Sequence, residues 1–143
     1  MRILIQRVKD TKLYVKNKLF SEIDNGFLIF LGIENGDEDK IDKAIDKILK
    51  IKIIEDEKGK FRYSLKEKPY PLLVVSEITL ISDFEENKPE FTNSPSKEIA
   101  ERIYLEFVKK LKEKNFKVEK GAFGEFMEIE NKNLGPVSFY LKI

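Results

Sequence analysis

The segment FLIFL at residues 27–31 decides how this chain folds, together with LLVVSEITLI at residues 72–81. Each segment begins as a continuous apolar run, which is typical of a β-strand buried on both faces. Between the two segments, from Asp39 to Ile51, apolar residues recur at helical spacing, which predicts an amphipathic helix. We therefore expect buried strands at the centre of the fold, with a helix packed against them.

A second helix is predicted from Ser94-Pro95-Ser96 to about residue 115, because a proline near the start and Glu98 in the first turn favour a helix N-terminus. Residues 83–95 are mostly polar and contain two prolines, which predicts a long loop. Further strands are predicted at residues 1–8, 11–16, 19–23, 51–54, 116–119, 126–130 and 137–143. Strands outnumber helices, and both helices can cover one side of a mixed sheet, so the pattern predicts a single α/β domain over residues 1–143.

The charges of the chain nearly balance, since 27 Lys and Arg residues against 26 Asp and Glu residues give a formal net charge of +1. This balance argues against a protein that coats nucleic acid nonspecifically, although it leaves room for a local basic patch. The opening MRILIQRVKD is charged too early for a secretory signal, and no apolar run approaches the ~20 residues of a membrane span. We expect a soluble, cytoplasmic protein.

The chain contains no histidine and no cysteine. Their absence excludes Ser-His-Asp and Cys-His catalysis, and it excludes metal sites that depend on His or Cys ligands. An enzyme with this composition must use carboxylates, hydroxyls, Lys, Arg, Tyr and backbone dipoles, or a reactive group of the substrate itself. We expect neither a metal nor a cofactor.

Three segments are candidates for chemistry: Ser76-Glu77-Ile78-Thr79, residues 121–127 (GAFGEFM) and residues 133–138 (NLGPVS). The first places a carboxylate and two hydroxyls in an apolar run, which is costly unless the carboxylate is paired. Simple alternation onto a solvated face is the other interpretation. The second is an adaptable apolar wall or a turn into a core strand. The third is an ordinary turn, or a place where backbone atoms approach a ligand closely.

These segments, in this order, resemble the D-aminoacyl-tRNA deacylases (the D-tyrosyl-tRNA deacylase family). LLVVSEITL is similar to the family's Ser-Gln-Phe-Thr segment, KVEKGAFGEFM to its Gly-x-Phe-Gly-x-x-Met stretch, and NLGPVS to its Asn-x-Gly-Pro-Val-Thr ending. MRILIQRV resembles the family's start, so the similarity covers nearly the whole chain. It implies a barrel-like mixed β-sheet with two main helices. It also implies a homodimeric hydrolase that frees tRNA of D-amino acids, and tRNA-Ala of mischarged glycine, as proofreading in translation.

The resemblance also implies the roles of the first segment. Ser76 and Thr79 match the family's hydroxyls, and the backbone N–H groups of Ile78 and Thr79 would form an oxyanion hole for the ester carbonyl. Glu77 would lie in the same catalytic segment. The 2′-hydroxyl of the terminal tRNA ribose would help to activate or position the attacking water, which agrees with a chain that lacks histidine.

The resemblance implies a second set of residues that bind the aminoacylated 3′ end of tRNA. Gly135-Pro136 would be cis and would enter the partner subunit's pocket, where its carbonyl oxygens would exclude any L side chain and admit hydrogen or a D side chain. Arg7 would support this loop. The remaining implied substrate-binding residues are Asn133, Ser138, Phe123 and Met127, the last two beside the terminal adenosine.

Three departures from the family pattern keep other functions open. Glu77 and Ile78 replace Gln and Phe, Ser138 replaces Thr, and the loop at residues 83–91 is acidic where the family is usually basic. Lys109, Lys110, Lys112 and Lys114 could supply phosphate contacts instead, or could form a solvated helix face. The alternatives are a non-catalytic family member that binds a nucleotide or RNA 3′ end, and an editing-like domain with a different substrate.

Overall fold

Two parallel strands form the centre of the sheet in the computed structural model, which covers residues 1–143. Strand β3 (Gly26–Gly32) pairs with β6 (Leu72–Ser76), with Phe27 opposite Leu72 and Leu31 opposite Ser76. The sheet runs in the order β10-β1-β3-β6-β9 and is mixed, because β1 is antiparallel to both of its neighbours while β9 is parallel to β6. The two segments expected at the centre of the fold therefore lie side by side there.

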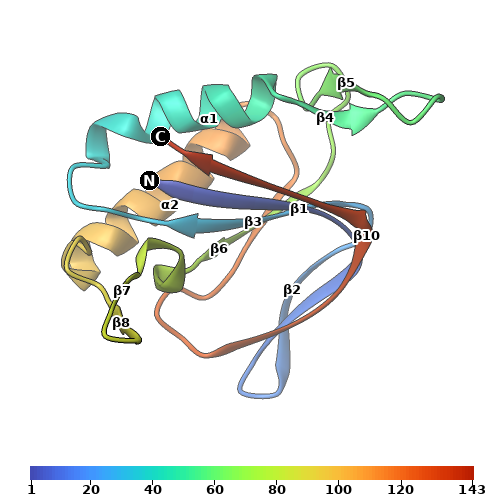
Figure 1. The fold of residues 1–143 in the computed structure, drawn as a ribbon. Helices are drawn as coiled ribbons and strands as arrows, with labels where there is room; N and C mark the ends of the chain where they lie inside the picture. Colours follow the sequence, from blue (N-terminus) through green and yellow to red (C-terminus); the bar gives the residue numbers. More distant parts are fainter.

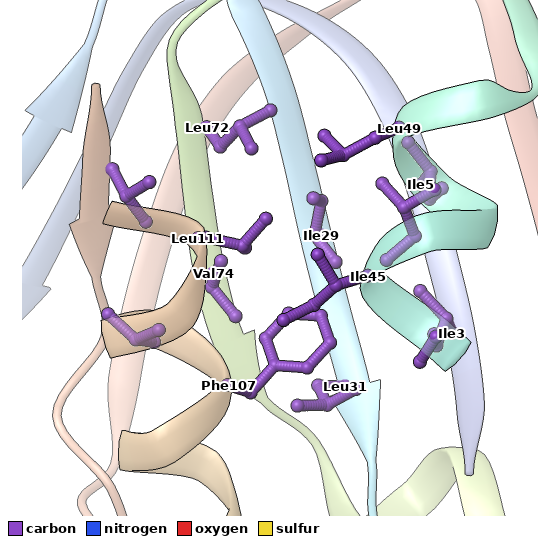
Figure 2. Packing of buried hydrophobic residues seen from close by; sticks show 14 of the residues in the cluster. Ile3, Ile5, Ile29, Leu31, Ile45, Leu49, Leu72, Val74, Phe107 and Leu111 are labelled. Carbon is purple, nitrogen blue, oxygen red and sulfur yellow. The ribbon is translucent and has the colours of Figure 1, made fainter. Parts of the chain in front are cut away.

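Both helices cover one face of this sheet, as predicted. Helix α1 (Ile41–Lys50) and helix α2 (Lys97–Glu113) bury their apolar sides against β1, β3 and β6 in the larger hydrophobic cluster. In Figure 2, side chains from both helices converge on those of the three strands, with Phe107 of α2 and Ile45 of α1 facing Leu31 and Ile29 of β3. Parallel strands must be joined by a crossover connection, and their faces must be buried. Helix α1 lies in the connection between β3 and β6 and helps to cover one face.

The opposite face is covered by the sheet itself. Strands β1 (Arg2–Val15) and β10 (Met127–Lys142) are long and pair over most of their length, and β2 (Lys18–Ile23) pairs with the far half of β1. This half of the sheet curls back over β3 and β6 and closes a second, smaller apolar cluster (Figure 1). The cluster consists of Val8, Leu13, Ile23, Leu28, Leu73 and Val75. The result is the barrel-like mixed sheet that the family resemblance implies.

The structure changes several predicted boundaries. Residues 1–8 and 11–16 belong to the single strand β1, with Asp10 at positive φ where the pairing shifts, and residues 126–130 and 137–143 belong largely to the single strand β10. The predicted loop at 83–95 contains a hairpin of β7 (Asp83–Glu85) and β8 (Lys88–Glu90), because Glu86 and Asn87 both adopt positive φ, as tight hairpin turns require. The remaining elements are a 3-10 turn η1 (Glu38–Lys40), β4 (Lys52–Glu55), β5 (Phe61–Ser64, not predicted) and β9 (Val118–Lys120).

The buried α-amino group of Met1 ties the two ends of the chain to the loop before α1. It forms ion pairs with Glu34 Oε2 at 2.9 Å and with Asp37 Oδ2 at 2.7 Å. The Ile143 amide donates to the Met1 carbonyl at 3.0 Å, so both termini lie together (Figure 1). Burial opposes the charged form of Glu34, but the ammonium of Met1 and the guanidinium of Arg2 outweigh it and hold the pKa of Glu34 below its ordinary value. None of the helices is long and apolar enough to cross a membrane.

The Met1 ion pairs predict a pH-dependent contribution to stability. Glu34→Gln removes one carboxylate partner of the buried ammonium and should lower the free energy of unfolding at pH 7. The folded pKa of Glu34 is depressed, so its contribution is fully present above the ordinary carboxyl pKa of ~4.3 and is lost as the pH falls through the lower folded value. Urea unfolding at pH 7 and pH 3 should therefore show a difference between wild type and variant that shrinks in acid. The exposed Glu38→Gln is the control, and an equal Glu34→Gln difference at both pH values contradicts this account.

Candidate functional site

Ser76 ends β6 at the edge of the sheet where β3 also ends. Because the two strands are parallel and in register, Leu31 and Ser76 reach this edge side by side. The Glu77 amide then donates to the Leu31 carbonyl at 2.9 Å, which extends the pairing by one residue. The chain leaves the sheet directly afterwards, so the prediction of one strand over residues 72–81 is wrong beyond Ser76.

A 3-10 turn, η2 (Ile78–Ile81), replaces the second half of that predicted strand. Gly32 makes the turn possible, since a Cβ there would lie only 2.8 Å from Ile81 Cγ2 and 2.9 Å from Leu80 Cβ. The Ser82 amide and hydroxyl both bond to the Thr79 carbonyl, at 3.2 and 2.7 Å, and close the turn. The N–H groups of Ile78 and Thr79 begin the turn and so have no partner within it.

Arg2 fixes the far side of η2. Its guanidinium donates to the Leu80 carbonyl at 3.3 Å and lies 3.6 Å from Asp83, while its Nε donates to Glu34 at 3.1 Å. Glu34 in turn pairs with the Met1 ammonium. The turn that carries the candidate catalytic residues is therefore anchored to the buried ion pairs at the N-terminus.

A cavity of about 520 Å³ opens beside η2. It brings together Ser76, Glu77 and Ile78 from the first predicted segment with Phe123 and Met127 from the GAFGEFM segment. Thr79 does not itself line the cavity, but its hydroxyl donates to the carboxylate of Glu77, which does. Glu77 is half-buried, so it neither sits on the solvated face of a strand nor lies deep in the core. Gly124 and Glu125 of the same GAFGEFM segment also line the cavity. Residues outside the three predicted segments complete the wall: Leu31, Ile33, Ser94, Pro95, Lys97 and Ala100.

Phe123 is held in place by Tyr104 of α2. The two ring centroids are 5.6 Å apart, and the buried Tyr104 hydroxyl lies within hydrogen-bonding distance of the Val74 carbonyl at 2.8 Å and the Gly121 carbonyl at 3.1 Å. Burial raises the pKa of Tyr104 above its ordinary value, so the phenol stays a hydrogen-bond donor. Gly121 allows Met127 to approach, because a Cβ at this position would lie 2.9 Å from the Met127 sulfur. The apolar wall of the cavity is thus held in place by α2, by β6 and by the close contact between Gly121 and Met127.

Lys97 is the cavity residue that the sequence gave least reason to expect. It is the first residue of α2, it packs against Gly124, and it forms no ion pair within 4.0 Å. It is also the only cation that lines the cavity, which the acidic residues Glu77 and Glu125 line as well. The Ser94-Pro95-Ser96 helix start predicted the position of this residue on a helix, but nothing in the sequence linked that helix start to the cavity.

Arg7 lies with the other group of predicted residues, around the bend of β10. Its Nε donates to the Leu134 carbonyl at 3.1 Å, and its Nη1 pairs with Glu55 at 2.9 Å. The Gly135-Pro136 peptide bond is cis, as the resemblance implies, and both residues are exposed. Arg7 therefore links the residue before this dipeptide to strand β4.

Asn133 and Ser138 shape the same bend from within. The Asn133 side chain accepts from the Val137 amide at 3.1 Å and donates to the Ser138 hydroxyl at 3.3 Å. Gln6 of β1 also donates to that hydroxyl, at 3.2 Å. Both side chains are thus engaged in holding the backbone of the segment.

The two groups of predicted residues lie at opposite ends of β3. Arg7 pairs with Phe27 at the start of that strand, while Ser76 pairs with Leu31 near its end. Four residues of extended strand separate the two positions by about 13 Å. In Figure 1 the β7–β8 hairpin that follows η2 and the bend of β10 beside β4 also lie at opposite ends of the molecule. Within one chain, the cavity and Gly135-Pro136 therefore do not form one site.

Comparison with known proteins gives this arrangement a family. The model of the D-Tyr-tRNA(Tyr) deacylase family matches residues 4–142. The chain belongs to this family. It is 45% identical to the D-aminoacyl-tRNA deacylase of Dictyoglomus turgidum, over 99% of this chain and 92% of that protein. It is 40% identical to the D-aminoacyl-tRNA deacylase of Aquifex aeolicus, over 99% and 97%.

Solved structures agree with the family assignment. A c-Myc DNA unwinding element binding protein superposes with a TM-score of 0.91 at 33% identity, covering 100% of this chain and 99% of that one. A probable eukaryotic D-amino acid tRNA deacylase superposes with a TM-score of 0.81 at 17% identity, covering 99% of this chain and 98% of that one, and shows the shared fold. The deacylase fold thus spans the whole chain.

The contacts of Arg7 predict a local rather than a global effect of its removal. Arg7→Ala should raise the hydrogen-exchange rates of the backbone N–H groups at residues 133–138, other than Pro136, about tenfold, because a hydrogen bond to a charged group is worth ~1.5–3 kcal/mol. Exchange measured by NMR or mass spectrometry reports this directly. Arg62→Ala is the control, since exposed Arg62 of β5 makes only a longer ion pair, 3.5 Å from Asp56. Unchanged exchange in the Arg7 variant shows that Arg7 does not support the segment.

Proposed function

We propose that this protein hydrolyses the ester bond of D-aminoacyl-tRNA, and with the same site releases glycine mischarged on tRNA-Ala, as proofreading in translation. The family and its relatives bear the name of this hydrolase activity, so tRNA is the substrate and ester hydrolysis is the reaction class. The observation that carries the proposal is the cavity at the end of β6, where Ser76, the start of η2 and an apolar wall come together.

The ester carbonyl binds at the start of η2. The N–H groups of Ile78 and Thr79 point away from the turn's own hydrogen bonds and stabilise negative charge on the carbonyl oxygen as water attacks. The terminal adenine packs against Phe123 and Met127, where an aromatic ring and a polarizable thioether suit a base. The carbon–oxygen bond to the ribose then breaks, giving free amino acid and tRNA.

The group that activates the water comes from the substrate. The chain has no histidine or cysteine, and the Thr79 hydroxyl already donates to Glu77. The 2′-hydroxyl of the terminal ribose lies next to the ester and can position or activate the water, while the protein supplies orientation and backbone dipoles. No cofactor takes part in this scheme.

Selection for D-amino acids requires a second subunit. Gly135 and Pro136 are exposed, lie on the edge strand β10, and are too far along the sheet to reach the cavity of their own chain. Exposed apolar side chains near the bend of β10 and along it favour burial against another chain. They are Leu134, Tyr140 and Phe61. The ring centroid of Phe61 lies 5.3 Å from that of Phe139 in β10. In a homodimer, the Gly135-Pro136 carbonyls would enter the partner's cavity and leave no room for an L side chain.

The cytoplasm, where tRNA is charged and used, is the proposed location.

Hydrolysis of three substrates tests the proposal. The purified protein should release D-Tyr from D-Tyr-tRNA and glycine from Gly-tRNA-Ala, and should leave L-Tyr-tRNA intact, because only hydrogen or a D side chain fits the filter. Release of labelled amino acid over time is the measurement. Binding of tRNA without hydrolysis of the first two substrates at high protein concentration identifies a non-catalytic family member instead, and hydrolysis of L-Tyr-tRNA contradicts the filter.

A further inference from the structure

We propose that Glu77 binds the α-ammonium group of the aminoacyl ester, and so makes this enzyme selective for esters with a free amino group. The inference builds on the proposed function and deepens it, since it assigns to one residue of the cavity the recognition of a specific part of the substrate. It rests on the position of Glu77 in the lining of the cavity, on its hydrogen bond with Thr79 and on the absence of a Lys or Arg side chain paired with it.

The Glu77 carboxylate faces the cavity without a cationic partner. It is half-buried, one of its oxygens accepts the Thr79 hydroxyl hydrogen, and its second oxygen has no hydrogen-bond partner in the protein. No Lys or Arg side chain lies within 4.0 Å of it, Lys97 included. A carboxylate of this kind is poorly compensated inside the protein, and a cation brought by the ligand would supply the missing partner.

The position of Glu77 matches the place where that cation arrives. In an aminoacyl ester the ammonium nitrogen and the carbonyl carbon are bonded to the same α-carbon. An ester whose carbonyl oxygen binds the N–H groups of Ile78 and Thr79 therefore holds its ammonium close to the start of η2. The hydrogen bond from the Thr79 hydroxyl holds the Glu77 carboxylate beside this same turn. The inference therefore places the free carboxylate oxygen next to the bound α-carbon.

Because substrate and product differ in charge, a contact with Glu77 favours binding of the substrate over binding of the product. A carboxylate in the site disfavours the polyanionic tRNA, and only the aminoacyl ester carries a cation that offsets the repulsion. Hydrolysis releases the amino acid together with its ammonium, after which Glu77 disfavours the deacylated tRNA that remains. The same residue thus favours the substrate over uncharged tRNA and over N-acylated esters.

Glu77→Gln tests the inference, because the amide keeps the shape of the side chain and removes its charge. The rates of hydrolysis of D-Tyr-tRNA and N-acetyl-D-Tyr-tRNA are compared as kcat/KM. The wild type should prefer the free amino group, and the variant should lose about tenfold of that preference, as expected for a charge-assisted hydrogen bond. Glu125→Gln, at the other carboxylate of the cavity, should leave the ratio of the two rate constants unchanged.

An unchanged ratio in Glu77→Gln overturns the inference, because it shows that Glu77 does not sense the ammonium. If both rate constants fall by the same factor, so that the ratio stays the same, the carboxylate acts on Thr79 or on water instead. A binding measurement keeps the test independent of catalysis. Adenosine carrying D-Tyr through a 3′-amide, with and without an N-acetyl group, is titrated calorimetrically against both proteins. Tighter binding of the free-amine form to wild type alone supports the inference, whereas equal binding rejects it. Failure of hydrolysis alone rejects only the proposed function.

Discussion

The parallel pairing of β3 with β6 is the constraint on which the rest of the structure depends. Parallel strands cannot be joined by a tight turn, so the chain must cross over between them, and it does so through α1. Their two buried faces need cover on both sides, which α1 and α2 provide on one face and the curled half of the sheet provides on the other. Because the strands run in the same direction, their carboxyl ends coincide, and the cavity forms there.

The chain has no histidine or cysteine, and the cavity instead offers backbone groups that are held in fixed positions. Gly32 gives η2 room to turn over the end of β3, Arg2 fixes the Leu80 carbonyl, and Gly121 lets Met127 close the wall. The N–H groups that result are held by contacts that reach the buried Met1 ammonium. Fixed dipoles of this kind act without reorganisation when charge develops on a substrate, so they can replace side chains that this sequence lacks.

Continuous apolar runs predicted the two central strands, helical spacing of apolar residues predicted the first helix, and the signals at Ser94-Pro95-Ser96 predicted the start of the second. The apolar pattern failed as a guide only locally. It failed after Ser76, where the apolar residues of ITLI fit a strand and a 3-10 turn equally well. The deciding contact is with Gly32, which lies far away in sequence. The hairpin in the acidic loop depends on Glu86 and Asn87, whose positive φ values could not be predicted from the sequence. Lys97 reaches the cavity only through the packing of α2, which no local sequence pattern indicated. The residues of the candidate site came from a family resemblance, which carried the order of motifs that no single motif could establish.

The central claim is that the cavity of one subunit works with Gly135-Pro136 of the other. Mixing two variants tests it most directly: Phe123→Ala/Met127→Ala, which damages the cavity, and Pro136→Ala, which damages the inserted segment. By this account the first variant is inactive, whereas the second keeps its cavity, loses the filter and hydrolyses L-Tyr-tRNA as well as D-Tyr-tRNA. In a mixed dimer the intact cavity receives the intact segment of the first variant. After exchange of subunits, verified by native mass spectrometry, an equal mixture should therefore show about half of the L-Tyr-tRNA hydrolysis per Pro136→Ala subunit, with hydrolysis of D-Tyr-tRNA retained. Mixed dimers that form without any loss of L-Tyr-tRNA hydrolysis would show that the segment does not act across subunits.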